Sequence, residues 1–484
     1  MKLFVQKLNL NLNPMQIKTK FGTWWTWFSA GLLACIPLLY ILDQWLASPA
    51  FHYGSNFYLI LITLIFLPRI RGLLLVITVI LIAVSVFLLF FSHAEMRDWT
   101  GNWGLNLSLA ALILCVPLLG IPVRIGGYIE MFQSFYVHYL RSVPAFYTIT
   151  TILTHTMGVF LNLGSVAVFY EISKANPFVK SDRIVATALI RGFGSVVSWS
   201  PFGLAMALIT TQLHVAWINI VWYMLGFALI GFAASFAVEW KLLMEESGKT
   251  GEEAERERKP LNREERALIR RKMLEIAGLF LLIGASVFLV DDLFHIGLVA
   301  AVCVVSLLFP VVWAVAKRNT GMLFKELHTY FHVSVPLMKK EVILFLTAGF
   351  FSGALANASS GQMFNAFLMD AFGGFTIGII MFICISFIML GMVGFPPVVI
   401  VTTYITMIDP AGLGFSAAYY ALVLLGCWTI LNALSPLTAL SQLIANLSGW
   451  NLTDVTVRWN LVYTVLLTGL FIVYLELLIR YGGV

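Results

Sequence analysis

Two stretches decide how this chain is interpreted: THTMGVFLNLGS at residues 154–165 and GFFSGALANASS at residues 349–360. In each stretch, small residues and one asparagine interrupt a long apolar run, and Asn357 follows Asn162 by 195 residues. Paired interruptions at corresponding positions of two halves are typical of membrane proteins that bind a solute where helices are broken. The sequence therefore predicts an internal duplication with a polar centre in each half.

The composition places both stretches in a membrane. Hydrophobic residues make up 60% of the 484 residues, charged residues make up 11%, and the mean hydropathy is +0.91. A soluble globule of this size needs more polar surface than that. Long continuous runs of Leu, Ile, Val and Phe favour helices over the short alternating segments of a β-barrel. We therefore expect an all-α polytopic membrane protein with roughly 10–13 transmembrane helices and the lipid bilayer as its partner.

Apolar runs mark the individual spans, because about 20 apolar residues are needed to cross the hydrocarbon core. The clear candidates are 23–46, 72–91, 104–123, 215–238, 273–290, 296–315, 377–390, 417–430 and 459–479. A further run at 56–67 is short, and two arginines follow it, which predicts a cytoplasmic edge there.

The charged residues predict the orientation. The net charge is +6, but the basic residues lie at segment ends and in one hydrophilic segment, 241–272, so they indicate cytoplasmic loops and no nucleic-acid partner. Residues 1–21 carry four lysines, and no small-residue cleavage site follows the first apolar run. This pattern predicts an uncleaved, cytoplasmic N-terminus. Segment 241–272 is also expected in the cytoplasm, and the protein as a multi-pass component of the cell membrane.

The order of elements repeats on the two sides of the charged segment. Each half contains two spans, a mixed aromatic and charged stretch, an interrupted run and a broken span. The chain then divides into 1–71 with the first spans, repeat one at 72–240, the linker at 241–272, and repeat two with the C-terminal spans at 273–484. The mixed stretches, 128–141 and 322–340, are predicted to be interfacial amphipathic helices, with ordinary polar loops as the alternative.

Each interrupted run is long enough to fold back on itself. Residues 142–172 and 341–370 offer about 30 residues each, which suffices for two half-depth helices that meet at a tip or for one long kinked span. Arg141 and Lys174 flank the first run, so both of its ends can stay on the cytoplasmic side. This favours a re-entrant hairpin. The side of the second run stays open, because lysines precede it and only Asp370 ends it.

The tips supply the first set of candidate ligands. A tip within the hydrocarbon must be buried in protein or line water, and its free backbone groups and helix dipoles then suit an ion or an anionic solute. Side-chain oxygens at the tips suit sodium and also hydrogen-bond a carboxylate. The candidates are Asn162, Ser165, Asn357, Ser359 and Ser360. The alternative is that these small and hydroxyl residues only let helices pack closely.

Broken spans supply the second set. The run 184–212 is interrupted by GFGSVVSWSP, which contains Ser198 and Ser200 and is predicted to unwind the helix. Spacing assigns its counterpart to 391–397, whereas the shared Ser-Pro pair assigns it to 432–438. Both segments can line the route. Ser435 and Thr438 are the candidates in the second segment.

Two ionisable residues inside these runs are also candidates. Arg191 lies well within a span, where a cation needs a partner. One possibility is that an anionic substrate binds it. The alternative is that its side chain extends to the membrane surface or pairs with Glu171. His155 can carry a proton near neutral pH, and a hydrogen-bonded packing histidine is the alternative.

No enzyme signature accompanies these features. The chain has no HExxH, GxSxG, Walker or GxGxxG sequence. The five cysteines stand singly inside apolar runs, so neither a tightly bound metal nor a disulfide framework is predicted. We expect no cofactor and no catalysis, and coupling to a sodium or proton gradient.

This arrangement resembles the ion-transporter superfamily, which includes sodium-coupled dicarboxylate carriers and arsenite permeases. The resemblance lies in the two interfacial stretches, the two asparagine-centred runs and the broken spans. It implies that substrate binds between two hairpin tips, 158–165 and 353–362, and two unwound segments, and it adds Gln362 to the site. It also implies an elevator movement and a homodimer. The tips read Leu-Asn-Leu and Ala-Asn-Ala here, so the Ser-Asn-Thr signature of the dicarboxylate branch is absent.

Three functions are compatible with the sequence. The first is a secondary active transporter (permease or symporter) of a small anionic solute or ion. The second is a membrane enzyme or lipid translocase, and the third is an accessory subunit that docks through segment 241–272. The orientation of the repeats stays open, because the superfamily has inverted repeats whereas basic residues precede both halves here.

Overall fold

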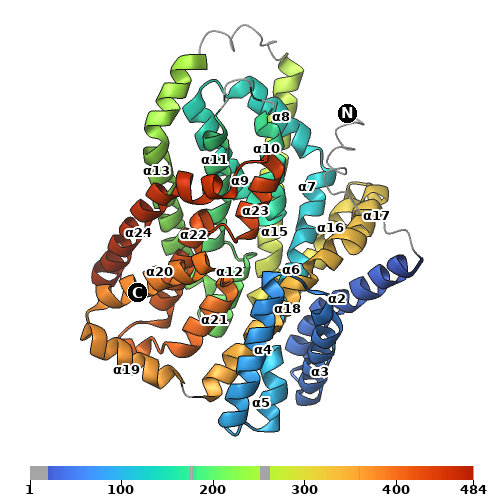
Figure 1. Ribbon diagram of the computed structural model, residues 1–484. Coiled ribbons are helices and arrows are strands. Elements are labelled where there is room, and N and C mark those ends of the chain that lie inside the picture. The colour runs from blue at the N-terminus through green and yellow to red at the C-terminus, as the bar shows by residue number, and fades with distance from the viewer. Residues whose placement is uncertain are drawn as a thin grey trace.

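The computed structural model describes residues 20–174, 176, 179, 181–250, 262–358 and 360–482. Within these ranges all regular elements are helical (Figure 1). Ten of the described helices are long and apolar enough to cross a membrane, or eleven when one bent pair counts as a span. This confirms the predicted all-α polytopic fold. The prediction of a cytoplasmic N-terminus concerns mainly residues 1–19, which lie outside the described residues.

Helices in the first half are α2 (Lys20–Leu46), α3 (Pro49–Phe66), α4 (Leu73–Phe91), α5 (Met96–Gly101), α6 (Leu107–Cys115), α7 (Ile121–Ile125), α8 (Tyr128–Tyr139), α9 (Val143–Leu161), α10 (Leu163–Lys174), α11 (Asp182–Gly194), α12 (Leu204–Gln212) and α13 (Trp217–Thr250). Helices in the second half are α15 (Arg263–Phe294), α16 (Leu298–Ala316), α17 (Thr320–Thr329), α18 (Val335–Asn357), α19 (Ser360–Phe372), α20 (Thr376–Val393), α21 (Pro397–Met407), α22 (Ala417–Leu434), α23 (Ala439–Ser448) and α24 (Trp459–Leu477).

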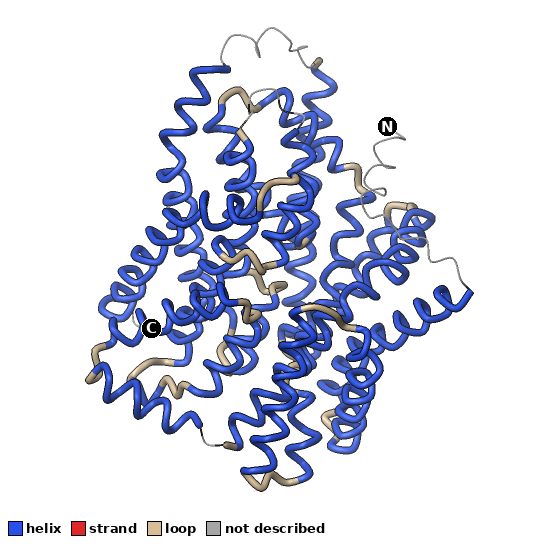
Figure 2. Tube along the Cα trace, in the orientation of Figure 1, coloured by secondary structure: helices blue, strands red, loops and turns tan. Residues whose placement is uncertain are grey.

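Short 3₁₀ and π turns extend or join these helices, so that little of the path is loop (Figure 2). The 3₁₀ turns are η1 (Leu67–Arg69), η2 (Asn102–Gly104), η3 (Val116–Gly120), η4 (Ser195–Ser198) and η6 (Ala411–Leu413). The π turns are η5 (Tyr330–Ser334), η7 (Asp454–Arg458) and η8 (Leu478–Gly482).

Local sequence explains where several helices begin. Ser142 caps α9 by accepting a hydrogen bond from the backbone, and α15 begins with a reciprocal capping box between Asn262 and Glu265. Helix α3 starts at Pro49. Proline is tolerated at the first helical position, because an N–H group there would have no partner within the helix. It is longer than the apolar run at 56–67 predicts, because an aromatic and small-residue segment continues the helix back to that proline.

Helices from the two halves interleave in space. Helix α18 packs against α4 and α6, while α22 and α24 pack against α11 and α13. In Figure 1 the blue amino-terminal helices lie beside α16 and α18, and green α13 lies beside red α24. One buried hydrogen bond illustrates the mixing, since the Asn106 side chain donates to the Phe345 carbonyl at 3.0 Å. The division at 72–240 and 273–484 is therefore a pattern in sequence, and the core is built from both halves.

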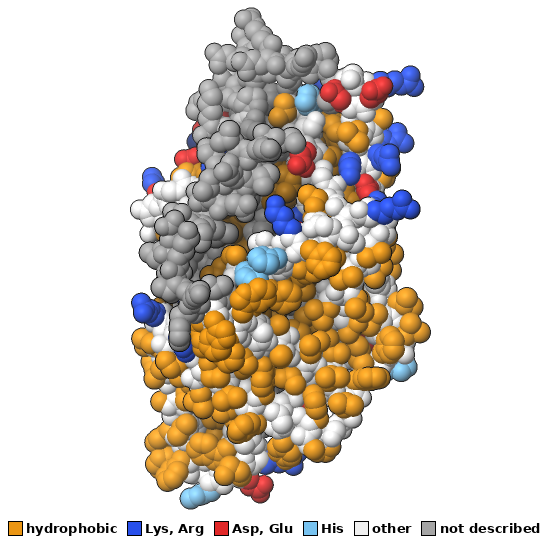
Figure 3. Space-filling view, turned by 90° about the vertical axis from the view of Figure 1, so that its right-hand side faces the viewer, with side chains coloured by type: hydrophobic (Ala, Val, Ile, Leu, Met, Phe, Trp, Pro, Cys, Tyr) orange, Lys and Arg blue, Asp and Glu red, His pale blue; other side chains and the backbone are white. Residues whose placement is uncertain are grey.

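Charged side chains gather mainly toward one end of the molecule. On the face shown in Figure 3, hydrophobic side chains cover most of the lower surface, and most acidic and basic side chains lie above them. Helices α4, α15 and α24 each expose several large apolar side chains, as expected where lipid takes the place of water. Helices α13 and α15 continue to Thr250 and from Arg263, so the described parts of segment 241–272 are largely helical, and residues 251–261 lie outside the described ranges.

The first interrupted run folds back on itself at Asn162. Tyr136 of α8 stacks edge-on against Phe146 near the start of α9 and lies beside Phe169 near the end of α10, with ring centroids 5.8 and 6.1 Å apart. The Asn176 side chain, just beyond α10, also donates to the Tyr136 carbonyl at 3.3 Å. The outer ends of α9 and α10 therefore meet at the same helix, and Asn162 forms the tip between them.

The second interrupted run has a different shape from the hairpin expected over 341–370. Helix α18 is followed by α19 at a bend of 75°. The difference follows from burial: the side chains of α18 are buried almost continuously from Val342 to Leu355, so the whole helix is needed in the core. Helix α19 exposes Met363 and Phe367 and runs along the edge of the molecule (Figure 1).

The two mixed aromatic and charged stretches also differ from each other. The first, 128–141, forms the separate helix α8. The second, 322–340, forms α17 and η5 and runs without a break into α18, so it does not form an element apart from the run that follows it.

Both broken spans have the interruption that the sequence predicts. Helix α11 passes into η4 and a turn before α12 begins at Leu204, and α22 ends before Ser435 while α23 begins at Ala439. A third break lies between α20 and α21, where Gly394 has φ +122°, a backbone conformation that favours glycine.

Candidate functional site

A cavity of about 170 Å³ lies where the α9–α10 tip meets the breaks of α11–α12 and α22–α23. Its polar side chains are those of Asn162, Ser200, Asn432 and Thr438, and the other lining residues are aliphatic, aromatic or glycine. The described lining contains no Asp, Glu, Lys, Arg or His. The cavity is thus a small, mostly apolar space with a few polar groups, which is the usual form of a small-molecule site.

Asn162 is held at the tip by an unusual backbone conformation. Its φ is +50° and its ψ is −140°, a region that non-glycine residues rarely adopt. Its side-chain oxygen accepts from the Leu163 N–H at 2.8 Å, and its carbonyl accepts from the Ser165 hydroxyl at 2.8 Å. Among the described residues no acceptor is bonded to the Asn162 amide nitrogen. That NH₂ group is therefore available to a solute in the cavity.

Asn432 is the second amide at the cavity. It lies in the last turn of α22, directly opposite Gly194 at the end of α11. Its side chain is 8% exposed, and no hydrogen bond to it is formed within the described part of the chain. Buried amides are normally bonded, so Asn432 is a polar group that lacks a protein partner at the wall of a cavity.

Three helices begin at this cavity. Leu163, Leu204 and Ala439 are the first residues of α10, α12 and α23, and all three line it. The first backbone N–H groups of a helix have no partner within that helix, and the helix dipole places partial positive charge there. Thr438 satisfies one of these groups in α23 by accepting from the Ser441 N–H at 3.2 Å. These helix starts therefore bring partial positive charge to the cavity without a cationic side chain.

Arg191 does not reach the cavity. Its guanidinium is completely buried and donates to Asn460 at 2.8 Å, to the Tyr147 hydroxyl and the Ser235 carbonyl at 3.2 Å, to Glu239 at 2.8 Å and to the Trp459 carbonyl at 2.9 Å. These bonds use all five N–H donors of the guanidinium. Its acidic partner is Glu239 of α13, and Glu171 pairs instead with Lys174. Arg191 thus joins α11 to α9, α13 and α24.

His155 is also bonded at both ring nitrogens. Trp199 donates to its Nε2 at 2.9 Å, and its Nδ1 lies 2.8 Å from the Ser195 hydroxyl. Because the indole N–H can only donate, Nε2 must be the unprotonated nitrogen, and the ring is neutral with its proton on Nδ1. His155 therefore fastens the hairpin to the break after α11, and it is not one of the residues that line the cavity.

The other predicted site residues fall into three groups. Ser165, Ser198 and Ser435 are buried and bond nearby carbonyls of Asn162, Ser195 and Gly391. Asn357 and Gln362 are not among the cavity residues: Gly353, one turn before Asn357, packs on Asn102, and Gly361 packs on the end of α21. Ser359 lies outside the described residues, and of Ser360 only the backbone is described.

The two candidate counterparts of the first break lie side by side but differ in their relation to the cavity. The Ser435 hydroxyl donates to the Gly391 carbonyl at 3.0 Å, and Gly394 lies next to Leu437. Segments 391–397 and 432–438 are therefore neighbours. Asn432 and Thr438 of the second segment line the cavity, and Asn432 faces the end of α11, whereas the described lining includes no residue of the first segment.

Asn432 is the one cavity amide that the sequence analysis did not select as a ligand. It stands three residues before Ser435 in the segment with the shared Ser-Pro pair. The signal was an asparagine inside a strongly apolar run immediately before a helix break, which is the pattern that selected Asn162 and Asn357.

Comparisons with known proteins give one informative result. No protein-family model and no curated protein sequence match the chain. A solved structure does: the crystal structure of the YdaH transporter of Alcanivorax borkumensis, described as having an unusual topology, has a TM-score of 0.57 and 14% sequence identity. The match covers 84% of this chain and 98% of that chain. The likeness is one of fold. It extends over almost the whole of YdaH.

Proposed function

We propose that this protein is a secondary active transporter that carries a small anionic solute across the membrane with sodium as the coupling ion. The supporting observation is the convergence of the first turns of α10, α12 and α23 on one small cavity whose described lining has no charged side chain. The overall fold, which is similar to that of a transporter, agrees with this function. The resemblance to the ion-transporter superfamily and a homodimeric assembly form part of the same proposal.

An anion fits this cavity better than a cation or a neutral apolar solute. Helix N-termini bind anions through backbone N–H groups and the dipole, and they do so without the strong desolvation penalty of a buried arginine. The NH₂ groups of Asn162 and Asn432, which have no acceptor within the described ranges, add two more donors. An arrangement of weak, neutral donors also suits transport, because the solute must leave as readily as it enters.

Sodium is the better coupling ion on the same grounds. Proton coupling requires a group that titrates where the solute binds, and the described lining has none. Sodium requires oxygen atoms, and the last carbonyls of α9, α11 and α22 end at the same breaks. Hydroxyl groups of Ser200 and Thr438 stand beside them.

The direct test is uptake into proteoliposomes under an imposed sodium gradient. The solutes are labelled acetate, lactate, succinate, phosphate and sulfate, each measured with a sodium gradient, a proton gradient and neither. We expect sodium-dependent accumulation of at least one of these anions. Accumulation driven by protons alone would replace sodium in the proposal, and no gradient-driven accumulation of any anion would refute the proposal.

Two variants test the site. Asn162→Gly removes the amide while keeping a residue that tolerates φ +50°, and Asn432→Ala removes the second amide within a helix. Each loses one hydrogen bond to a charged solute, worth about 1.5–3 kcal/mol, so uptake is expected to fall by about ten-fold or more. Asn451→Ala, at an exposed asparagine outside the cavity, is the matched control. Equal uptake by all three variants and the wild type would place the solute elsewhere.

A further inference from the structure

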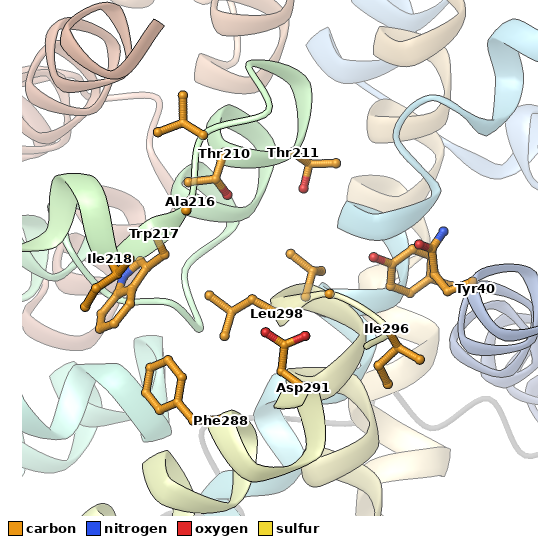
Figure 4. Close-up of a pocket in the computed structure, with 14 residues that line it drawn as sticks. Tyr40, Thr210, Thr211, Ala216, Trp217, Ile218, Phe288, Asp291, Ile296 and Leu298 are labelled. Carbon is orange, nitrogen blue, oxygen red and sulfur yellow. The ribbon is translucent and has the colours of Figure 1, made fainter. Parts of the chain in front are cut away.

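A second and larger cavity, of about 540 Å³, lies at the other end of α12 (Figure 4). It is lined by the ends of α2, α12 and α15 and by the starts of α13 and α16. Helix α12 joins the two cavities, because its first residues line the smaller one and Thr210 and Thr211 in its last turn line the larger one. The larger cavity lies at the ends of α13 and α15 opposite to the charged segment 241–272.

Asp291 is the only charged residue in the described lining of this larger cavity. Figure 4 shows its carboxylate pointing from α15 into the cavity, past Leu298. No hydrogen bond or ion pair to this carboxylate is formed by the residues that the structure describes. An unpaired carboxylate in a concave apolar space focuses negative potential, which attracts cations.

The carboxyl ends of α2, α12 and α15 meet at this cavity beside the starts of only two of the described helices, α13 and α16. Asp291 lies in the last turn of α15, and Thr210 and Thr211 lie in the last turn of α12. The carboxyl end of a helix carries partial negative charge, which disfavours an acidic residue in the last turn. Neither helix has a basic residue in that turn. A bound cation would therefore offset a charge that the carboxyl end of α15 disfavours.

The remaining walls fit an organic cation better than a metal ion. Trp217 and Phe288 form one wall with ring centroids 5.4 Å apart, and Tyr40 stands on the opposite side. Aromatic faces attract ammonium groups, and the aliphatic lining accommodates an apolar body. The cavity also has the size of a small-molecule site, whereas a metal ion would need several oxygen ligands close together.

We propose that this cavity is a binding site for an organic ammonium ion, in which Asp291 balances the charge and the Trp217–Phe288 wall contacts the cationic group. The site is separate from the anion cavity and does not depend on the proposed transport function. Because the two sites lie at opposite ends of α12, a compound can occupy one while the other is empty.

The test uses the purified full-length protein in detergent with benzyltrimethylammonium as the probe. Binding is measured by calorimetric titration and by the shift in the thermal unfolding midpoint, since a ligand that binds only the folded state stabilises it. Sodium chloride at equal ionic strength and benzyl alcohol, which has the ring without the charge, are run in parallel. We expect the ammonium probe to bind and stabilise the protein more than either.

Variants locate the site. Asp291→Asn is expected to weaken binding of the probe by at least ten-fold, and Phe288→Leu to weaken it several-fold. Asp292→Asn is the matched control, because Asp292 is exposed next to Asp291 and does not line the cavity. Without the probe, the Asp291→Asn protein is expected to be at least as stable as the wild type, since an unfavourable charge is removed.

Three results would overturn the proposal. The first is equal affinity of wild type and Asp291→Asn for benzyltrimethylammonium. The second is an equal loss of affinity in Asp292→Asn, which would show a general effect of net charge. The third is a stabilisation by sodium or benzyl alcohol as large as that by the probe. Transport assays do not enter the test, so a failure here leaves the anion cavity unaffected.

Discussion

Glu239→Gln is expected to destabilise the protein strongly, although residue 239 lies away from both cavities. Glu239 is completely buried on α13, and its two carboxylate oxygens pair with Arg191 at 2.8 Å and with Arg183 at 3.0 Å. Glutamine keeps the shape but removes the charge. Arg191 is then left as a fully buried cation that keeps only neutral acceptors.

The magnitude follows from the burial of the pair. Removing one partner of a buried ion pair costs about 3–5 kcal/mol. The Arg183 contact adds little, because the side chain of Arg183 is 37% exposed and solvent screens it. With an unfolding entropy of about 2.1 cal/mol/K per residue, a chain of this length changes by about 1 kcal/mol per degree, so the midpoint of thermal unfolding should fall by about 3–5 °C.

The assay is thermal unfolding of the purified protein in detergent. The fraction that stays folded after heating is measured by size-exclusion chromatography. Glu245→Gln on the same helix is the control, because Glu245 and Lys241 form a solvent-exposed pair with 3.9 Å between them, and no measurable change is expected there. Replacing both Arg191 and Glu239 by methionine should give a higher midpoint than Glu239→Gln alone. A Glu239→Gln protein as stable as the wild type would refute this reasoning. If an Arg191 variant had normal stability but no uptake, Arg191 would instead be assigned to substrate binding.

Two further substitutions test the packing around the anion cavity. Gly192→Ala places a Cβ 2.5 Å from a backbone oxygen of α9, so it should force α11 away from the hairpin and destabilise the protein by about 1–3 kcal/mol. Gly194→Ala, whose nearest contact is 3.5 Å, should be tolerated. Equal midpoints of thermal unfolding for the two variants would contradict this prediction. Cys384 and Cys427 have sulfur atoms 3.3 Å apart, so a membrane-permeant oxidant should cross-link α20 to α22. The experiment uses a protein with its other cysteines replaced and a protease site inserted between these helices. After cleavage, the two fragments should stay together on a non-reducing gel. Separation of the fragments would show that the two cysteines are not neighbours.

Much of the fold was predictable because a membrane imposes simple rules on a sequence. The apolar runs predicted nearly every long helix, since backbone groups in hydrocarbon must be bonded within the segment. The asparagine in residues 154–165 and the Ser-Pro pairs marked real interruptions for the same reason, because only strong local signals break a helix there. For 341–370 the sequence left a hairpin and one long kinked span open: α18 stays continuous because α4, α6 and α21 bury it, and those neighbours come from distant parts of the chain.

The candidate site was predicted only in part, because a polar residue in a membrane span needs a partner and the sequence does not name it. Arg191 and His155 were candidates for solute or proton binding, and each has all of its ring or guanidinium nitrogens bonded to protein groups. Asn162 and Asn432 have the opposite outcome, since each lines the cavity with an NH₂ group that has no acceptor among the described residues.

By itself, the sequence determined that this protein is a bundle of membrane helices and where those helices break, since both properties depend on the local balance of apolar, small and helix-breaking residues. Tertiary structure alone decided which breaks meet. It brought the tip at Asn162 to the breaks before Leu204 and Ala439 and left Asn357 outside the resulting cavity. The physical reason is that a helix end has no intrahelical partner for its backbone groups, and only the packing of distant helices decides whether another helix, water or a solute supplies one.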